Sequence, residues 1–237
     1  MLRFLFSGKP ANNAPLRQPA TKHQPLPPMR HLTAADIAAF EKVYRLNLVN
    51  GLPGYKPANL VGTAAPDGRT NLAIFSSVLH LGSDPAVLGM VTRPTTVPRH
   101  TYQNIKDNGG CYTLSHVPLP LAAQAHYTSA NFEDESEFDA CGFTAEYRDG
   151  FPAPYVAESP LSIGLRLREE HPIFNGTVLL VGLVEHVYLR PKALRPDGTL
   201  DLAAADTAAI SGLDGYHQVL PPVRYGYARP GQFPEPL

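Results

Sequence analysis

The sequence predicts a mainly β protein: an antiparallel barrel or sandwich with short helices on its outside. Two observations favour this fold class. Six short apolar segments with strand character are separated by turn residues, and 25 prolines and 19 glycines are many for a helical protein. Regular helical crossovers do not separate these segments, so a parallel sheet is not indicated.

The first predicted elements are a helix and a β-hairpin. Thr33 is a suitable N-cap for a helix, and apolar residues follow it at helical spacing, at Ile37, Phe40, Tyr44 and Leu48. Two strands, 59–65 and 70–75, then flank Pro66-Asp67-Gly68-Arg69. Asp-Gly between two apolar runs is typical of a hairpin turn, so these two strands should pair.

The middle of the chain mixes strands with short helices. Residues 87–92 form an apolar run that predicts a strand. A short helix should follow at 101–108, closed by Gly109 and Gly110, because glycine readily adopts the backbone conformation that ends helices. The next predicted elements are a strand at 111–117 and short helices at 121–128 and 136–140.

The last strands carry the clearest pattern. In residues 161–168 apolar side chains alternate with smaller or charged ones, as expected for a strand with one buried face and one wetter face. The turn Asn175-Gly176 leads to a partner strand at 177–189. A final helix is predicted for residues 202–210.

One domain, residues 31–220, accounts for these elements. Residues 1–30 are rich in Pro, Asn, Gln and Ala without periodicity, which predicts an extended N-terminal arm. Residues 221–237 form a Pro-rich C-terminal tail of similar character. Such ends are either disordered or laid across a partner subunit.

Charge and cysteine content exclude several function classes. A formal net charge of −1 gives no support for nucleic-acid binding. The two cysteines, Cys111 and Cys141, lie outside any CxxC, so we expect buried thiols rather than zinc ligands or a disulfide framework. No apolar run reaches membrane-spanning length, and the apolar start is too short for a signal peptide. We therefore expect a soluble, cytoplasmic protein with no membrane partner.

Common catalytic motifs are also missing. The sequence contains no GxGxxG, no GxxxxGK[ST] and no GxSxG. The nine histidines are scattered without metal-ligand spacing, so no metal site is predicted. An acidic run at 133–139 is interpreted as a solvated loop and helix start, because a calcium loop needs ordered spacing and a turn glycine.

The segment 92–105, TRPTTVPRHTYQNI, is the candidate binding site. It carries hydroxyl and cationic residues at a strand end and at a helix start: Thr92, Arg93, Arg99, His100 and Thr101. Hydroxyls, guanidinium groups and helix-terminal amides suit a phosphate. The strand before it ends in small and hydroxyl residues that would let a flat ring approach the backbone: Ala73, Ser76 and Ser77. A solvated loop is the alternative interpretation.

Collinear motifs between Leu60 and His217 resemble the flavin-reductase-like FMN-binding split-barrel family, which includes the flavoredoxins. The matching pieces are Asp67-Gly68-Arg69-Thr70-Asn71-Leu72-Ala73, Ser83-Asp84-Pro85, Arg99-His100-Thr101, Glu137-Phe138, Glu158-Ser159-Pro160, Val181-Gly182-Leu183-Val184 and Gly215-Tyr216. His100 stands where the family usually has an acidic residue, and Ala86 stands where it usually has a second proline.

The resemblance implies a six-stranded antiparallel split β-barrel (Greek key) that forms homodimers and binds FMN in a groove at the subunit interface. The isoalloxazine ring would be lined by Asn71, Leu72, Ala73, Ser76 and Ser77, partly through backbone groups. The phosphate and ribityl chain would be held by Thr92, Arg93, Arg99, His100 and Thr101. NADH or NADPH would give hydride to flavin N5, and since the flavin carries the electronics, no dedicated catalytic side chain is expected.

Three functions stay open at this level. The first is an NAD(P)H-dependent flavin reductase, with FMN as a tight cofactor or an exchangeable substrate. The second is a flavoredoxin-like electron carrier without NAD(P)H activity of its own, and the third is a non-enzymatic barrel that acts through partner binding. The presence of both the phosphate segment and the ring segment favours the first.

Overall fold

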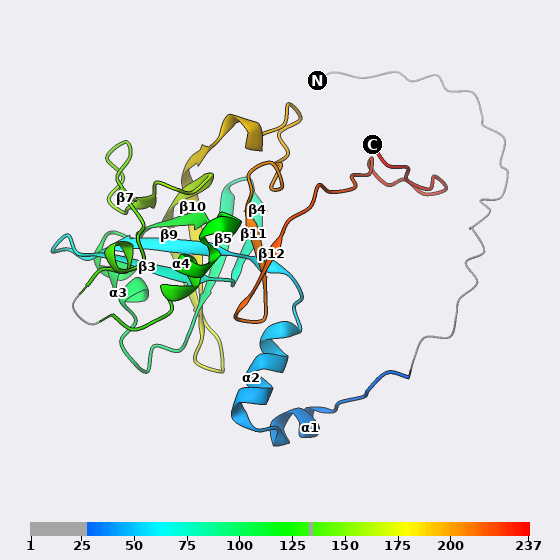
Figure 1. Ribbon diagram of the computed structural model, residues 1–237, viewed down its shortest axis with the longest axis horizontal. Coiled ribbons are helices and arrows are strands. Elements are labelled where there is room, and N and C mark those ends of the chain that lie inside the picture. Colours follow the sequence, from blue (N-terminus) through cyan, green and yellow to red (C-terminus); the bar gives the residue numbers. More distant parts are fainter. Residues whose placement is uncertain (1–27, 133–134) are drawn as a thin grey trace. The chain divides into compact units, whose positions relative to one another are not determined.

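A seven-stranded antiparallel sheet forms the centre of the fold, with β9 and β10 side by side in its middle (Figure 1). The computed structural model describes residues 28–132 and 135–237. The strands follow one another across the sheet in the order β3-β2-β6-β9-β10-β5-β4. Their bounds are Asn59–Ala64 (β2), Thr70–Phe75 (β3), Val78–Ser83 (β4), Ala86–Thr92 (β5), Cys111–His116 (β6), Leu161–Pro172 (β9) and Val178–Leu189 (β10).

The two edge strands of this sheet, β3 and β4, are consecutive in the chain. Only Ser76 and Ser77 join them, and three residue steps of extended chain reach at most about 10 Å. The sheet must therefore curl until its two edges lie close together, although β3 and β4 do not pair with each other. The mainly β, antiparallel architecture that the sequence predicts is confirmed as an open, curled sheet.

Six of the seven strands coincide with the six segments predicted from the sequence, and the seventh is β4. The prediction of a six-stranded sheet is therefore corrected to seven strands. Strand β4 starts directly after Ser77, without a glycine or proline to divide it from β3. It is also a half-exposed edge strand, so it lacks the continuous apolar run that marks a buried strand.

The turn between β2 and β3 forms as its Asp-Gly motif predicts. Gly68 has a φ of 89°, a left-handed conformation that glycine adopts without strain. The backbone N–H of Ala65 accordingly reaches the carbonyl of Arg69 at 2.9 Å and closes the hairpin. Asn175-Gly176 likewise forms the turn between β9 and β10, as predicted.

Strand β2 is buried on both faces, so the core extends to both sides of the sheet. On one face, Leu60 belongs to an apolar cluster under the short helices, with Leu72, Val117, Phe138, Phe143 and Ile210. On the other, Val61 belongs to the cluster inside the curled sheet, with Met90, Ile105, Tyr112, Leu114, Leu165 and Leu180. Strands β2 and β3 thus offer a rigid platform for the elements around them.

Three short helices pack against this platform, at places the sequence predicts. They are α3 (His100–Asp107), α4 (Ala122–Tyr127) and α5 (Glu137–Ala140). Helices α4 and α5 pack on β3, and α3 packs on both β2 and β3. A 3-10 turn, Leu119–Leu121, leads into α4. Cys111 and Cys141 are both free and buried, as expected.

The predicted N-terminal helix is two helices, α1 (Ala34–Ala39) and α2 (Lys42–Gly51). Thr33 caps α1 as predicted, because its Oγ1 accepts the N–H of Asp36 at 3.2 Å. The break follows from Glu41. Its carboxylate accepts the N–H groups of Val43 and Tyr44 at 2.9 and 3.4 Å, which makes it the N-cap of a second helix.

The prediction of a helix at 202–210 is wrong. Ala208–Ser211 form strand β11, which lies between β1 (Lys56–Pro57) and β12 (Gly215–Gln218) in a three-stranded sheet. The alanine-rich run favours a helix, but Ala208 and Ile210 are buried in the core. Burial and β-pairing of this segment override its local propensity. The remaining elements are β7 (Ala145–Glu146), β8 (Tyr155–Val156) and a 3-10 turn at Pro191–Ala193.

Residues 38–222 form one compact unit, and Val223–Leu237 lie outside it. The predicted N-terminal arm, 1–30, falls outside the described residues except for its last three, which are exposed. Within the predicted tail, 221–237, isolated bridges join Tyr225 to Pro236 and Arg229 to Gln232. None of the helices in the described chain has the length and apolar character needed to cross a membrane.

Candidate functional site

A buried pair of polar side chains fastens the start of α3 to strand β3. Asn71 Nδ2 donates to Thr101 Oγ1 at 3.0 Å, and the two residues are only 7% and 8% exposed. A buried polar group that loses its partner costs about 1–3 kcal/mol, so each side chain holds the other in place. The structure thus joins one residue predicted for the ring segment to one predicted for the phosphate segment.

Helix α3 is held at two further points. Asn104 Nδ2 donates to Thr63 Oγ1 of β2 at 3.1 Å. On the outer side, the carboxylate of Glu170 in β9 accepts Lys106 Nζ at 2.8 Å and the Tyr102 hydroxyl at 3.0 Å. The Lys106 ammonium lowers the pKa of Glu170, so this contact stays ionised at neutral pH. The N-terminus of α3 therefore has a fixed position.

The link between β3 and β4 lies against the end of β5. Ser77 Oγ donates to the carbonyl of Val91 at 2.7 Å, and the Val91 N–H donates back to the Ser77 carbonyl at 3.1 Å. Thr92, the next residue, is buried, and its Oγ1 is 3.4 Å from the carbonyl of Val178, which is long for a hydroxyl donor. Its hydroxyl is therefore only weakly engaged. Ser76 is partly buried beside Ser77.

The loop from Thr92 to α3 places two arginines at the strand end and the helix start. Arg93 is exposed. Arg99 is the N-cap residue of α3 in an extended conformation, and its side chain does not cap the helix. Its Nε donates instead to the Pro94 carbonyl at 3.3 Å, which folds the loop back on itself. His100, the first helical residue, is exposed. The positive end of the helix dipole and arginine side chains are groups of the kind that anion sites use.

The hydrogen-bonding edge of β3 is occupied by residues from the covering helices. The Leu72 N–H donates to Glu137 Oε2 at 3.1 Å, and the Ile74 N–H donates to Thr128 Oγ1 at 2.9 Å. Leu72 is also fully buried, so neither its side chain nor its N–H is free for a ligand. Ala73 is partly buried and pairs with Val61 of β2. A ligand at this strand would meet side chains on its surface rather than backbone N–H groups at its edge.

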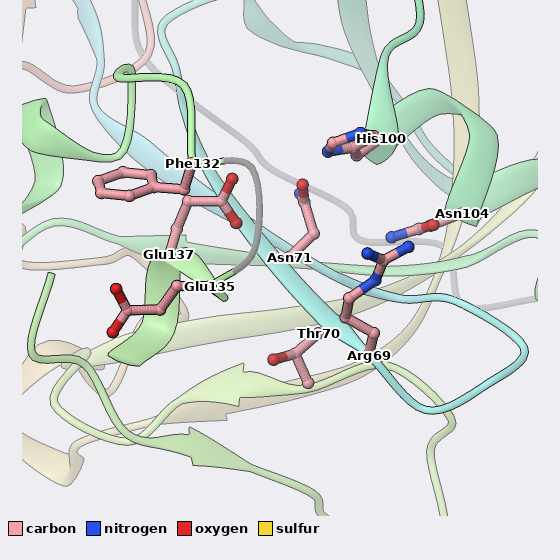
Figure 2. A pocket seen from close by; sticks show the side chains of 8 residues that line it. All are labelled: Arg69, Thr70, Asn71, His100, Asn104, Phe132, Glu135 and Glu137. Carbon is pink, nitrogen blue, oxygen red and sulfur yellow. The ribbon is translucent and has the colours of Figure 1, made fainter. Parts of the chain in front are cut away.

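A small pocket of about 40 Å³ opens between β3, α3 and α5 (Figure 2). This volume has room for a few water molecules. Figure 2 shows the carboxylates of Glu135 and Glu137 on one side, Arg69 and His100 on the other, and Asn71 between them. The lining is completed by Thr70, Asn104 and Phe132. The pocket thus has an acidic wall and a basic wall.

Sequence reasoning missed the roles of Glu137 and Asn104. It places Glu137 in a solvated acidic run, whereas the structure joins it to the N–H of Leu72, 65 residues away. The helix start itself is predictable, since Ser136 Oγ accepts the N–H of Phe138 at 3.3 Å. The contact of Glu137 with strand β3 is not predictable, because the two segments are far apart in the sequence. The available signal for the role of Asn104 was its position in the helix, one turn after Thr101.

The comparisons with known proteins agree with this geometry. A family model for the flavin reductase like domain matches residues 55–205. A solved split-barrel protein assigned to the flavin reductases, from Shewanella frigidimarina NCIMB 400, is 44% identical. The match has a TM-score of 0.80 and covers 84% of this chain and 100% of that one.

Two further proteins are more distantly similar. The flavoredoxin of Desulfovibrio vulgaris (Miyazaki F) is 26% identical, with a TM-score of 0.62, and the match covers 72% of this chain and 90% of that one. An uncharacterized protein of Aquifex aeolicus (strain VF5) is 26% identical over 166 residues, which cover 65% of this chain and 84% of that protein. The curled sheet is therefore a split barrel of the kind implied by the sequence motifs.

Proposed function

This chain belongs to the flavin reductase like family, and from that membership we propose that it is an FMN-binding oxidoreductase that passes hydride from NADH or NADPH to flavin N5. Bound FMN would supply the redox chemistry, because the isoalloxazine ring carries the electrons. The protein's part is to bind, orient and shield the reactants. No dedicated acid or base is needed for that part, and we assign no catalytic side chain.

The observation that carries the proposal is the anion site at the start of α3. Arg99 and Arg93 supply cations, Thr92 and Thr101 supply hydroxyls, and α3 adds uncapped N–H groups. This donor set fits a phosphate monoester, which is the charged end of FMN.

The ring of the flavin would lie along the face of β3 and the link that follows it. Asn71, Ala73, Ser76 and Ser77 are small or polar and partly accessible or fixed by hydrogen bonds. Leu72 contributes only by supporting the strand from within the core. Donors at this face would stabilise the negative charge that a reduced flavin gathers at its N1–C2 edge.

Arg99→Ala tests the phosphate assignment. The change removes a charge-assisted hydrogen bond worth about 1.5–3 kcal/mol, which is roughly ten- to a hundredfold in FMN affinity. Riboflavin lacks the phosphate, so its affinity should barely change. Arg99→Lys should restore only part of the FMN affinity, because an ammonium lacks the planar fork of the guanidinium.

Titration of the apo-protein with both ligands measures this difference. Arg190→Ala, at an exposed arginine after β10, is the matched control and should leave both affinities unchanged. Equal weakening of FMN and riboflavin by Arg99→Ala would contradict the phosphate site. Protein that takes up no flavin at all would favour the non-enzymatic barrel.

The likeness to a flavoredoxin supports a second candidate, an electron carrier without NAD(P)H activity of its own. Anaerobic addition of NADH or NADPH separates the two. Bleaching of the flavin absorbance at catalytic rates supports the reductase. Flavin that is reduced only by a protein donor supports the carrier. We further propose that the chain works as a homodimer, with the flavin groove between its subunits.

A further inference from the structure

The turn between β9 and β10 presents an aromatic ring to solvent. Phe174 is 102% exposed, more than any other large apolar side chain in the described chain. A single exposed apolar residue is common on protein surfaces, so its place in the structure decides what it can do. Two features of that place, the rigidity of the turn and its neighbours, make the ring a contact for a ligand.

Hydrogen bonds hold the turn that carries Phe174 in one conformation. The N–H of Ile173 donates to the Thr177 carbonyl at 2.8 Å, and the N–H of Gly176 donates to the Ile173 carbonyl, also at 2.8 Å. The side-chain carbonyl of Asn175 accepts both the N–H and the hydroxyl of Thr177, at 3.1 and 2.7 Å. Because the turn is already ordered, a ligand that contacts Phe174 would pay little entropy for fixing the loop.

This turn lies beside the segment proposed for the flavin phosphate. Val178, the first residue of β10 after the turn, pairs with Thr92, the last residue of β5. The turn and the loop that follows Thr92 are therefore neighbours beyond the ends of these two strands. A Cβ atom at Gly176 would lie 3.5 Å from the Cβ of Pro94, and the carbonyl of Pro94 accepts Arg99 Nε. The turn thus contacts the loop that carries the arginines.

The two segments that meet here carry positive charge and no negative charge. Residues 93–99 contain two arginines, and neither this segment nor residues 172–177 contain a carboxylate. The last carboxylates of β9 each have a partner, in the pairs Glu170–Lys106 at 2.8 Å and Glu169–His171 at 3.0 Å. This surface therefore suits a ligand that combines phosphate groups with a flat ring.

We propose that this turn binds the adenylate half of FAD, with Phe174 stacked on the adenine ring, so that the protein accepts FAD as well as FMN and binds FAD more tightly. FAD extends FMN at its phosphate, so the added adenylate begins at the proposed phosphate site. Arg93 directly follows Thr92 and is thus on the side of that site next to the turn, where it can pair with the second phosphate. Adenine offers a flat face that stacks on phenylalanine.

The covalent link in FAD decides between two sources of adenine. NADH and NADPH also contain an adenosine group, but only in FAD is that group attached to the phosphate that the loop is proposed to hold. This inference rests on the proposed flavin site and specifies the flavin that the site prefers.

Calorimetric titration of the full-length apo-protein with FAD and with FMN tests this assignment. Phe174→Ala should weaken FAD binding about tenfold or more and leave FMN binding unchanged, because the lost stacking concerns only the adenine. Phe174→Tyr should keep most of the FAD affinity, since it keeps the aromatic face. Tyr55→Ala, at an exposed aromatic residue that packs against His217 of β12, is the matched control and should change neither affinity.

Three results would overturn the inference. Equal affinities of the wild type for FAD and FMN, both unchanged in Phe174→Ala, would mean that the adenine makes no contact with the turn. Equal weakening of both flavins would mean that Phe174 only supports the phosphate loop. A rise in the KM for NADH or NADPH in Phe174→Ala, measured with FMN and without a loss of FAD affinity, would assign the ring to the nicotinamide dinucleotide instead.

The FMN titration keeps this inference distinguishable from the proposed function. Wild-type protein that binds neither FMN nor FAD would contradict the flavin site itself, and the inference with it. Wild-type protein that binds FMN, but whose Phe174→Ala variant shows no selective loss of FAD, would contradict only the adenine contact.

Discussion

The Asn71–Thr101 pair should contribute a measurable coupling energy to stability, because it is buried and joins two distant segments. Thr101→Val removes the acceptor at nearly constant shape and leaves the Asn71 amide without its buried partner, which costs about 1–3 kcal/mol. Asn71→Ala removes the donor and adds a small cavity, so its cost should be at least as large. In the double variant neither group is left unpaired. The loss of stability in the double variant should then be smaller than the sum of the two single losses by about 0.5–1.5 kcal/mol.

Urea unfolding of the four proteins, followed by far-UV circular dichroism at pH 7, measures this cycle. The chain contains its own comparison, since Asn104 and Thr63 form a second amide–hydroxyl pair at 3.1 Å with similar burial. The cycle Asn104→Ala with Thr63→Val should therefore give a coupling of similar size. Additivity within about 0.3 kcal/mol at both pairs would refute the reasoning, because it would mean that the pairs do not hold α3.

Three further predictions concern the barrel and its ends. Gly182→Ala should destabilise the fold by about 1–3 kcal/mol, because its Cβ would lie 2.1 Å from the hydroxyl of the buried Tyr112. Tyr112→Phe should relieve part of that loss in urea unfolding, and an unaltered loss would contradict this steric cause. Burial lowers the pKa of His116 to about 4 from 6.5, so acidification below pH 6.5 protonates the unfolded chain first and reduces the free energy of unfolding, by about 1–3 kcal/mol at pH 4. In His116→Gln that part of the pH dependence should vanish, and a slope equal to wild type would count against it. Deletion of residues 1–30 should leave the thermal transition nearly unchanged, since their composition cannot offset the entropy of ordering; a large drop would show that the arm packs.

Local signals explain which parts of the fold could be predicted from the sequence. The Asp67-Gly68 and Asn175-Gly176 turns place both hairpins correctly, because turn chemistry depends on adjacent residues. Ser136 and Thr33 mark helix starts for the same reason. In contrast, Ala208 and Ile210 sit in an alanine-rich run whose helical propensity is overridden by burial against distant strands. Strand β4 was not predicted, because no turn residue separates it from β3.

The candidate site likewise combines residues that local sequence predicts with contacts that depend on long-range packing. Arg99 and Thr101 belong to a strand–loop–helix unit, so a short window of sequence brings them together. The contact between Glu137 and the N–H of Leu72 depends on how α5 packs on β3, which no local pattern encodes. The sequence also does not predict that the start of α3 lacks a side-chain cap. This follows from the Arg99 side chain, which donates to the Pro94 carbonyl instead.

The occupied edge of β3 has a consequence for solubility. An edge strand with free N–H groups is a template on which strands of other molecules can add, and this is a common start of aggregation. Glu137 and Thr128 already accept the outward N–H groups of Leu72 and Ile74, and a carboxylate at that edge also repels an approaching carbonyl. Replacing both acceptors by alanine would free the outward N–H groups of Leu72 and Ile74 for pairing with a strand of another chain. The residues that cover this edge therefore also protect the barrel from strand addition by other copies of the chain.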